Sequence, residues 1–433
     1  MEQRRDRPVR VGLLGCGHVG SAVARMLRDH ADEVAARAGS NVEIVRVAVH
    51  NLSKERDVDL PGELYTNEPH EIVRDPGVDI VVECIGGIEP ARSLILEAFE
   101  QGKPVVTANK ELLSTLGREL FEAAEKHRVD LLYEASVGGG IPLIRPLKQG
   151  LAGERIVKLM GIVNGTTNYV LTRMAEDALS LQDAVAEAQQ LGYAERDPST
   201  DIEGFDAAAK AAILAMIAFD TQVVAGDVYR EGITGISAQD IHFAQQLGYV
   251  VKLLAIAETQ DGDVSVRVHP AMVPADHPLA TVRHSFNAVV IEGRRVGSVM
   301  LYGRGAGGDP TATSVVGDLV EAVHNLREGT ASHAPVTYQP RRIKPIDEIS
   351  SQYYILLEVD DRPGVLAAIA TAFSEHDVSI KSVWQEGQGE EAQLVMITHR
   401  AGERDLQACV HALRALEPVR SVSSVLRVEA AEP

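Results

Sequence analysis

The sequence GCGHVG, residues 15–20, is a GxGxxG loop, and it decides the fold of the N-terminal part of the chain. The apolar run VRVGLL (9–14) before it predicts a strand, and a helix is expected to open at about His18. In such a unit the three glycines allow a tight turn, a close approach to a pyrophosphate and close helix–strand packing. A glycine-rich turn without a ligand is the simpler alternative, but the strand–turn–helix context favours binding. We expect a dinucleotide at the helix N-terminus, contacted by Gly15, Gly17, His18, Val19 and Gly20.

Apolar runs and amphipathic stretches alternate from residue 9 to about 135. This pattern indicates βαβ units and a doubly wound, Rossmann-like parallel sheet. Ligands bind such sheets at the carboxyl ends of the strands, which makes Gly86, Thr107 and Lys110 expected cofactor contacts. The predicted strands are 10–14, 43–49, 79–84, 104–107 and 130–133, and the predicted helices are 21–37 and 114–127.

The end of the second predicted strand bears on the type of cofactor. The acidic residue that usually binds a ribose 2′-hydroxyl is absent, and His50 and Asn51 stand in its place. Lys54 and Arg56 follow, and nearby cations favour a 2′-phosphate. The sequence therefore favours NADP, while NAD stays open because both cations also suit a solvated loop.

The middle of the chain, from about 140 to 305, has the sequence pattern of a mixed α/β domain. Ser180 is placed to cap a helix over 181–191 that Gly192 ends, and an Ala-rich, buried helix is expected over 206–219. Strands are expected over 264–268 and 288–291. The glycine-rich run 303–308 precedes a helix over 313–326 and is expected to return the chain to the cofactor, with Gly307 as the contact.

The C-terminal part reads as a separate ferredoxin-like α+β unit. Its order is βαββαβ, with strands at 354–359, 378–384, 393–398 and 422–428 and helices at 364–375 and 404–416. We expect these domains: a dinucleotide-binding domain of 1–135 with 305–330, a catalytic and dimerisation domain of 136–304, a polar linker of 331–350, and a C-terminal domain of 351–430.

Composition limits the possible partners. The 62 acidic residues outnumber the 42 basic ones, for a net charge of −20. Nucleic acids and anionic membranes bind to positively charged surfaces, so neither is expected as the main partner of this acidic chain. The three distant cysteines suggest no disulfide framework, and no signal peptide or long apolar span is evident. These features predict a cytoplasmic protein.

Three ionisable residues stand out as candidates for chemistry. Asp206 and Lys210 lie four apart on the apolar helix, where a charged pair is costly to bury without purpose. A structural ion pair is the alternative. Lys110 follows a buried strand at the expected ligand edge, although a surface lysine is the simpler interpretation. The acidic loop 192–205 could receive a substrate ammonium.

Four stretches resemble the homoserine dehydrogenase family. They are AxxxGYAExDPxxDIxGxDxxxK (188–210), VVTANK (105–110), EASVGGGIP (134–142) and NGTTNY (164–169). The resemblance covers about residues 9–330. It implies reversible NAD(P)H-dependent reduction of L-aspartate 4-semialdehyde to L-homoserine, a step in threonine, methionine and isoleucine biosynthesis.

The same resemblance implies roles for individual residues. Lys210 would protonate the carbonyl oxygen, and Lys110 would assist as a second cation that lowers the proton affinity of the first. Asp206 would hold Lys210 and the hydroxyl end of the substrate, and Glu195 would bind its amino group. Further pocket or cofactor contacts are expected from Tyr193, Thr166 and Gly192.

The EASVGGGIP stretch resembles the family's monovalent-cation loop. Mostly backbone oxygens of Glu134, Val137, Gly139 and Ile141 would bind a sodium ion. An unliganded glycine-rich turn is the alternative.

The stretch DDRPGVLA (360–367) resembles the first turn of ACT domains. By that resemblance L-threonine would be the effector, with contacts expected from Asp361, Gly364 and Val365. ACT domains usually pair, so a homodimer or homotetramer is expected. A domain that serves only in oligomerisation is the alternative.

Two other functions compete with this interpretation. A related oxidoreductase, such as an aspartate dehydrogenase or another semialdehyde reductase, would lack the 188–210 pattern. A cofactor- and amino-acid-binding sensor without turnover would not need Lys110, Glu195, Asp206 and Lys210 together.

Overall fold

The computed structural model describes residues 7–331, 338–387 and 392–429, which form two compact units. Unit 1 comprises 1–157, 209–227 and 292–341, and unit 2 comprises 158–208, 228–291 and 342–433. Residues 332–337 of the expected linker lie outside the described residues, as do 1–6 and 430 of the expected domains.

Unit 1 contains a parallel sheet with the strand order β3-β2-β1-β4-β5-β6. Every described pairing in it is parallel. This is the order of a dinucleotide-binding sheet, and it confirms the predicted doubly wound fold. The strands are β1 (Val9–Leu14), β2 (Val42–Ala48), β3 (Tyr65–Thr66), β4 (Ile80–Glu83), β5 (Val105–Thr107) and β6 (Leu131–Leu132).

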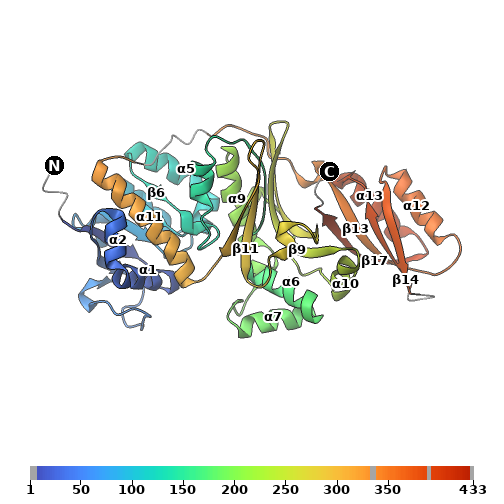
Figure 1. The fold of residues 1–433 in the computed structure, drawn as a ribbon, viewed down its shortest axis with the longest axis horizontal. Coiled ribbons are helices and arrows are strands. Elements are labelled where there is room, and N and C mark those ends of the chain that lie inside the picture. Colours follow the sequence, from blue (N-terminus) through green and yellow to red (C-terminus); the bar gives the residue numbers. More distant parts are fainter. Residues whose placement is uncertain (1–6, 332–337, 388–391, 430–433) are drawn as a thin grey trace. The chain divides into compact units, whose positions relative to one another are not determined.

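Helices cover both faces of this sheet. Figure 1 shows α11 beside α1, and residues of both helices share one hydrophobic core with alternate residues of β1. On the opposite face, Gly12 of β1 leaves room for the side chain of Ile72 on α3. The helices are α1 (His18–Asp29), α2 (Ala31–Ala38), α3 (Pro69–Arg74), α4 (Ala91–Glu100), α5 (Lys110–His127) and α11 (Gly308–Glu328).

Three predicted helix boundaries were wrong. The helix expected over 313–326 is α11, which begins at Gly308, with Gly307 as its N-cap. The helix expected over 21–37 is two helices, because His30 leaves the helical conformation with φ −120° and ψ 31°. The helix expected to begin at 114 begins at Lys110, because the side chain of Asn109 accepts a hydrogen bond from Leu112 N and caps it there.

Unit 2 contains the strands of a mixed sheet, in the order β11-β7-β9-β10-β17-β13-β15-β14. The predicted cap of α7 is confirmed, since Ser180 accepts a hydrogen bond from Asp183 N. The first part of the unit holds β7 (Ile156–Ile162), α6 (Gly165–Asp177), α7 (Leu181–Gln190), α8 (Ser199–Ile202), β8 (Tyr229–Arg230), α10 (Ala238–Gln246), β9 (Tyr249–Gln260), β10 (Asp263–Pro274) and β11 (Phe286–Gly293). Helix α9 (Phe205–Phe219) begins in unit 2 and ends in unit 1, and β12 (Gly297–Arg304) belongs to unit 1.

The C-terminal part of unit 2 has the predicted βαββαβ order. Its strands are arranged β17-β13-β15-β14, with antiparallel neighbours. Alternate residues of β13 share a core with both helices, which therefore lie on one face of the sheet. The elements are β13 (Ser350–Val359), α12 (Val365–Glu375), β14 (Ile380–Glu386), β15 (Gln393–Thr398), β16 (Ala401–Gly402), α13 (Glu403–Ala415) and β17 (Val419–Val428).

The described helices include none that is both long and apolar enough to cross a membrane.

Candidate active site

The glycine loop between β1 and α1 has the geometry that its sequence predicts. Gly15 has a φ of +94°, and a Cβ there would lie 2.7 Å from the Cys84 carbonyl oxygen. A Cβ on Gly20 would lie 2.1 Å from the Gly15 carbonyl oxygen, so only glycine lets the helix approach the turn this closely. Gly17, the N-cap of α1, has no atom within 4 Å of its Cβ position. The helix N-terminus therefore offers open N–H groups to an anion.

Two further glycine-rich segments of unit 1 meet this loop. A Cβ on Gly308, the first residue of α11, would lie 3.0 Å from His18 Nε2. Its neighbour Gly307 caps α11 with a φ of +116°. A Cβ on Gly139 would lie 2.6 Å from Gly305, so the 303–308 run also contacts the 134–142 segment. The structure thus places the N-termini of α1 and α11 together, as expected for a return of the chain to the cofactor.

A cleft of about 550 Å³ adjoins the glycine loop. The guanidinium of Arg56 donates 2.6 Å to the Lys54 carbonyl oxygen and lies 5.1 Å from the centre of the Tyr65 ring. This places two cations at the end of β2. The cleft is lined by Gly15, Cys16, Gly17, Ala48, Val49, His50, Asn51, Lys54, Arg56, Asn67, Pro69, Cys84, Ile85 and Pro90.

A buried carboxylate that the sequence analysis missed organises the next two strand ends. Glu83, the last residue of β4, is fully buried. One of its oxygens accepts hydrogen bonds from Ile85 N (2.7 Å) and Gly86 N (3.0 Å), and the other accepts one from Thr107 Oγ1 (2.6 Å). Thr107 Oγ1 in turn accepts a hydrogen bond from Asn109 N at 3.0 Å. The expected contacts Gly86 and Thr107 are thus joined through Glu83.

Asn109 extends this network to Lys110. Its amide nitrogen donates 2.7 Å to the Gly87 carbonyl oxygen, and its Oδ1 accepts from Leu112 N at 3.1 Å. Lys110 is the residue that follows this cap and begins α5. The loop after β4 and the helix that carries the lysine are therefore fixed to one another by hydrogen bonds.

Asp206 and Lys210 are both nearly buried on α9, with exposures of 4% and 7%. Their neighbours on the helix are mostly apolar, as predicted from the sequence. Helices α5 and α9 are in contact in unit 1, because a Cβ on Gly117 would lie 3.6 Å from the Met216 side chain. The helix that carries Lys110 and the helix that carries Lys210 therefore touch at Gly117 and Met216.

The expected substrate residues of unit 2 gather around the loop that follows α7. Gly192 has a φ of +76°, and Tyr193 N donates to the Ala188 carbonyl oxygen at 2.8 Å, which ends α7 as predicted. Thr166 Oγ1 donates 2.7 Å to the Tyr193 carbonyl oxygen. Glu195 is exposed on the same loop. Thr166 and Tyr193 are therefore in direct contact.

The loop expected to bind a cation is buried in unit 1. The Glu134 carboxylate accepts hydrogen bonds from Leu143 N (2.5 Å), Ile144 N (2.7 Å) and Arg145 N (2.8 Å). This carboxylate is occupied in holding the turn, so backbone carbonyls are the better candidate ligands. The Gly139 carbonyl accepts one hydrogen bond from Ser314 Oγ at 2.6 Å and keeps a second lone pair. In the described residues no three His, Cys, Asp or Glu side chains form a metal-binding group.

The expected effector turn lies between β13 and α12. Gly364 caps α12 with a φ of +94°, and nothing lies within 4 Å of its Cβ position. Val365 is buried, whereas Asp361 is exposed and accepts a hydrogen bond from Gln385 Nε2 at 3.3 Å. The turn therefore leaves space beside a helix N-terminus.

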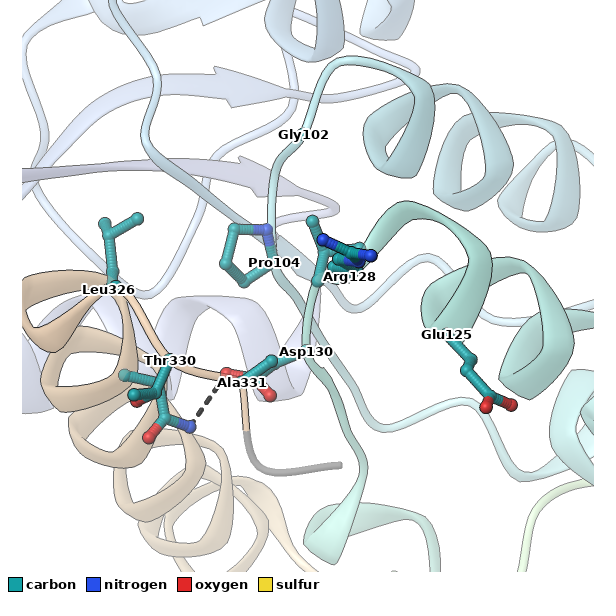
Figure 2. A pocket seen from close by; sticks show the side chains of 11 residues that line it. Gly102, Pro104, Glu125, Arg128, Asp130, Leu326, Thr330 and Ala331 are labelled. Carbon is teal, nitrogen blue, oxygen red and sulfur yellow. Dashed lines mark hydrogen bonds between the residues drawn. The ribbon is translucent and has the colours of Figure 1, made fainter. Parts of the chain in front are cut away.

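A second pocket in unit 1 lies away from the glycine loop, at the end of α5 and of α11. Figure 2 shows Asp130, Leu326 and Thr330 around it. Asn325 also lines the pocket, and its Nδ2 donates a hydrogen bond of 2.8 Å to Asp130 Oδ2. Asp130 precedes β6, so the pocket lies at the amino edge of the sheet. Ligands of doubly wound sheets bind at the opposite edge.

Comparison with known proteins decides the family. The models for "Homoserine dehydrogenase" and "Homoserine dehydrogenase, NAD binding domain" match residues 142–320 and 15–134, and an ACT domain model matches 353–418. The chain is 48% identical to homoserine dehydrogenase of Mycobacterium tuberculosis, with 98% of each chain covered. The chain belongs to the homoserine dehydrogenase family. It is therefore an oxidoreductase that acts on a CH–OH group, and the alternative of another reductase is not supported.

Solved structures of homoserine dehydrogenases agree with this assignment. That from Thiobacillus denitrificans is 40% identical, with a TM-score of 0.93 over 98% of this chain and 99% of the other. A hyperthermophilic archaeal homoserine dehydrogenase in complex with NADPH is 28% identical, with a TM-score of 0.62 over 73% of this chain and 97% of the other. The family match makes a nicotinamide cofactor part of the enzyme. The ACT domain is consistent with a regulatory ligand.

Proposed function

We propose that this homoserine dehydrogenase interconverts L-homoserine and L-aspartate 4-semialdehyde with NADP(H), through Lys210, Lys110, Asp206 and Glu195. The observation that carries the proposal is the nearly buried pair Asp206 and Lys210 on the apolar helix α9. Buried ionisable groups are costly to keep, and they concentrate at functional sites.

Lys210 is assigned the proton transfer. When bound, the nicotinamide supplies or takes the hydride. In reduction the substrate oxygen develops negative charge, and the ammonium of Lys210 stabilises it and donates the proton. In homoserine oxidation the same nitrogen accepts the proton. Lys110, which begins α5, serves as a second cation for the developing charge.

The acidic residues are assigned to the substrate. Asp206 lies four residues before Lys210 on α9, where its carboxylate orients the ammonium and binds the hydroxyl end. Glu195, exposed on its loop, binds the amino group. Tyr193 and Thr166, which are hydrogen bonded to each other, line the substrate pocket, and Gly192 contacts the cofactor.

We assign NADP rather than NAD as the preferred cofactor. Lys54 and Arg56 line the cleft at the end of β2, where a carboxylate would bind a ribose 2′-hydroxyl. The open N-cap Gly17 receives the pyrophosphate, with Gly15, His18, Val19 and Gly20, and Gly307 approaches from α11. The residues at the nicotinamide end of the cofactor are Gly86, Thr107 and Lys110. The NADPH complex of the archaeal relative supports this choice.

A monovalent cation and an effector complete the proposal. Backbone carbonyls of Glu134, Val137, Gly139 and Ile141 would hold a sodium ion, which stiffens the turn between the two glycine-rich segments. L-threonine would bind the ACT turn through Asp361, Gly364 and Val365. The proposal includes a homodimer or homotetramer and a cytoplasmic location.

One assay tests the main points. Purified protein is given homoserine with either NADP or NAD, and formation of the reduced cofactor is followed. The assay is then repeated with sodium exchanged for a bulky organic cation, and again with threonine added. We expect faster turnover with NADP, loss of rate without sodium and inhibition by threonine. Absence of homoserine oxidation with either cofactor would overturn the proposal. An Asp361→Ala variant that keeps its turnover but loses threonine inhibition supports the effector site, and unchanged inhibition contradicts it.

A further inference from the structure

Asn164, the first residue of the NGTTNY stretch, holds two carboxylates with one amide group. Its Nδ2 donates to Asp201 Oδ1 at 2.7 Å and to Asp206 Oδ2 at 2.9 Å. Its Oδ1 accepts from Thr167 N at 2.9 Å and caps α6. Asn164 itself is buried. Both the donor nitrogen and the acceptor oxygen of its side chain therefore have hydrogen-bond partners within the protein.

This arrangement fixes which way the amide faces. An amide has two N–H donors on one side and an acceptor oxygen on the other. The carboxylates need donors and the N-terminus of α6 needs an acceptor, so only one orientation satisfies both. No other uncharged side chain of this size supplies two donors and a cap acceptor together.

The two carboxylates would otherwise repel each other. Asp201 comes from α8 and Asp206 from α9, and both lie within hydrogen-bond distance of one nitrogen. Two like charges this close repel each other electrostatically. The shared amide offsets the repulsion and fixes the position of the Asp206 carboxylate on a helix that also carries Lys210.

We infer that Asn164 is a positioning residue that orients Asp206 toward the substrate and Lys210, with Asp201 as a second anchor of the same amide. The inference rests on the function proposed above for Asp206. A helix cap alone would not require the contact to two carboxylates, whereas a positioning role does.

The variant Asn164→Asp separates the two roles. An aspartate remains a good N-cap, but at neutral pH it has no donor and adds a third negative charge beside Asp201 and Asp206. We expect the kcat/KM for homoserine to fall on the order of 100-fold at neutral pH, as for a displaced catalytic group, with NADPH affinity unchanged. As the pH falls and the introduced carboxyl is protonated, it regains one donor, so the loss relative to the unaltered enzyme should shrink.

Two further variants serve as controls. Asn164→Ala lacks donors at every pH, so its loss relative to the unaltered enzyme should not shrink in acid. Ser180→Ala removes the cap of α7 in the same unit and should lower thermal stability without changing kcat/KM. Bound NADPH, measured by fluorescence, reports that each variant is folded.

The outcomes distinguish the inference from the proposed function. If the unaltered enzyme oxidises homoserine and Asn164→Asp keeps its kcat/KM, Asn164 is only a cap and the inference fails. The inference also fails if Asn164→Asp and Asn164→Ala respond identically to pH. If the unaltered enzyme does not oxidise homoserine, the proposed function itself fails.

Discussion

Thr107 Oγ1 donates a hydrogen bond of 2.6 Å to Glu83 Oε2, which joins the carboxyl ends of β4 and β5. Both residues are fully buried. Through Thr107 and Asn109 the bond reaches the cap of α5, where Lys110 begins. A buried carboxylate with three donors thus determines where the loops of the cofactor edge lie, without being one of the predicted site residues.

Thr107→Val should weaken this edge, whereas Thr107→Ser should not. Valine has nearly the same shape but leaves one oxygen of buried Glu83 without its donor, which costs about 1–3 kcal/mol of stability. Because the carboxylate that holds Gly86 N then loses its link to Thr107 on β5, we expect a higher KM for the cofactor as well. Serine keeps the hydroxyl and should restore both values. Thermal unfolding and cofactor titration measure the difference, and equal behaviour of the two variants would contradict the network.

Lys210→Ala should leave NADPH binding intact and remove most of the reduction of the semialdehyde. Loss of a proton donor lowers turnover by about 10²–10⁴-fold. The exposed Lys126, near the end of α5, is a matched control whose alanine variant should retain turnover. Unchanged turnover of Lys210→Ala would remove this residue from the mechanism.

The parallel sheet and its glycine loop could be predicted because both are local patterns. Val11 and Leu13 alternate with Gly12 in one buried strand, and the loop follows directly. The break at His30 was missed, because both sides of it continue an amphipathic pattern. Strand β9 (Tyr249–Gln260) was also missed, since an apolar run of that length does not distinguish a strand from a helix.

The positioning residues could not be predicted because their partners are distant in sequence. Glu83 and Thr107 are separated by 24 positions, and Asn164 and Asp206 by 42. A glutamate that ends a strand is commonly a surface residue, and only the folded chain brings it to Thr107. The motif residues, such as Lys210, could be named as candidates from the sequence because their spacing resembles a family pattern.

Lys54→Ser should raise the KM for NADP by about tenfold, the value of a single charge-assisted hydrogen bond. The exposed lysine lies on the loop after β2 and lines the cleft. The KM for NAD, which has no 2′-phosphate, should not change and serves as the internal control. An equal rise in KM for both cofactors would mean that Lys54 supports the loop and does not contact the 2′-phosphate of NADP.

Deletion of residues 350–433 is the direct test of a regulatory ACT domain, and the structure predicts that the deletion also lowers the stability of the remaining chain. Strand β17 pairs in parallel with β10, and Arg267 is bonded to both Glu258 and Glu429. The deletion removes Glu429 from an arginine whose side chain is only 3% exposed. We expect the truncated enzyme to lose threonine inhibition and to melt at a lower temperature. Retained inhibition would contradict the regulatory role, and an unchanged melting temperature would contradict the structural one.

Glu429→Gln tests the same junction through its pH dependence. Burial raises the pKa of the Glu429 carboxyl, but Arg267 and Lys158 outweigh this and lower it to about 2. Because the folded-state pKa lies below the value of about 4.3 in an unfolded chain, the ionised carboxylate stabilises the fold above that pH. The stabilisation is lost as the pH falls from about 4.3 toward 2.

Glutamine keeps the shape of the side chain but carries no charge to pair with Arg267, which loses one of its two carboxylates. The variant should therefore be about 3 kcal/mol less stable near neutral pH, as for other buried pairs that lose one partner. Its stability should also fall less steeply than that of the unaltered enzyme between pH 4 and pH 2, because one of the titrating groups is gone. Chemical unfolding at several pH values measures both effects. A constant difference across that range would mean that the fold does not lower the pKa of the Glu429 carboxyl, so that its charge does not stabilise the contact between β10 and β17.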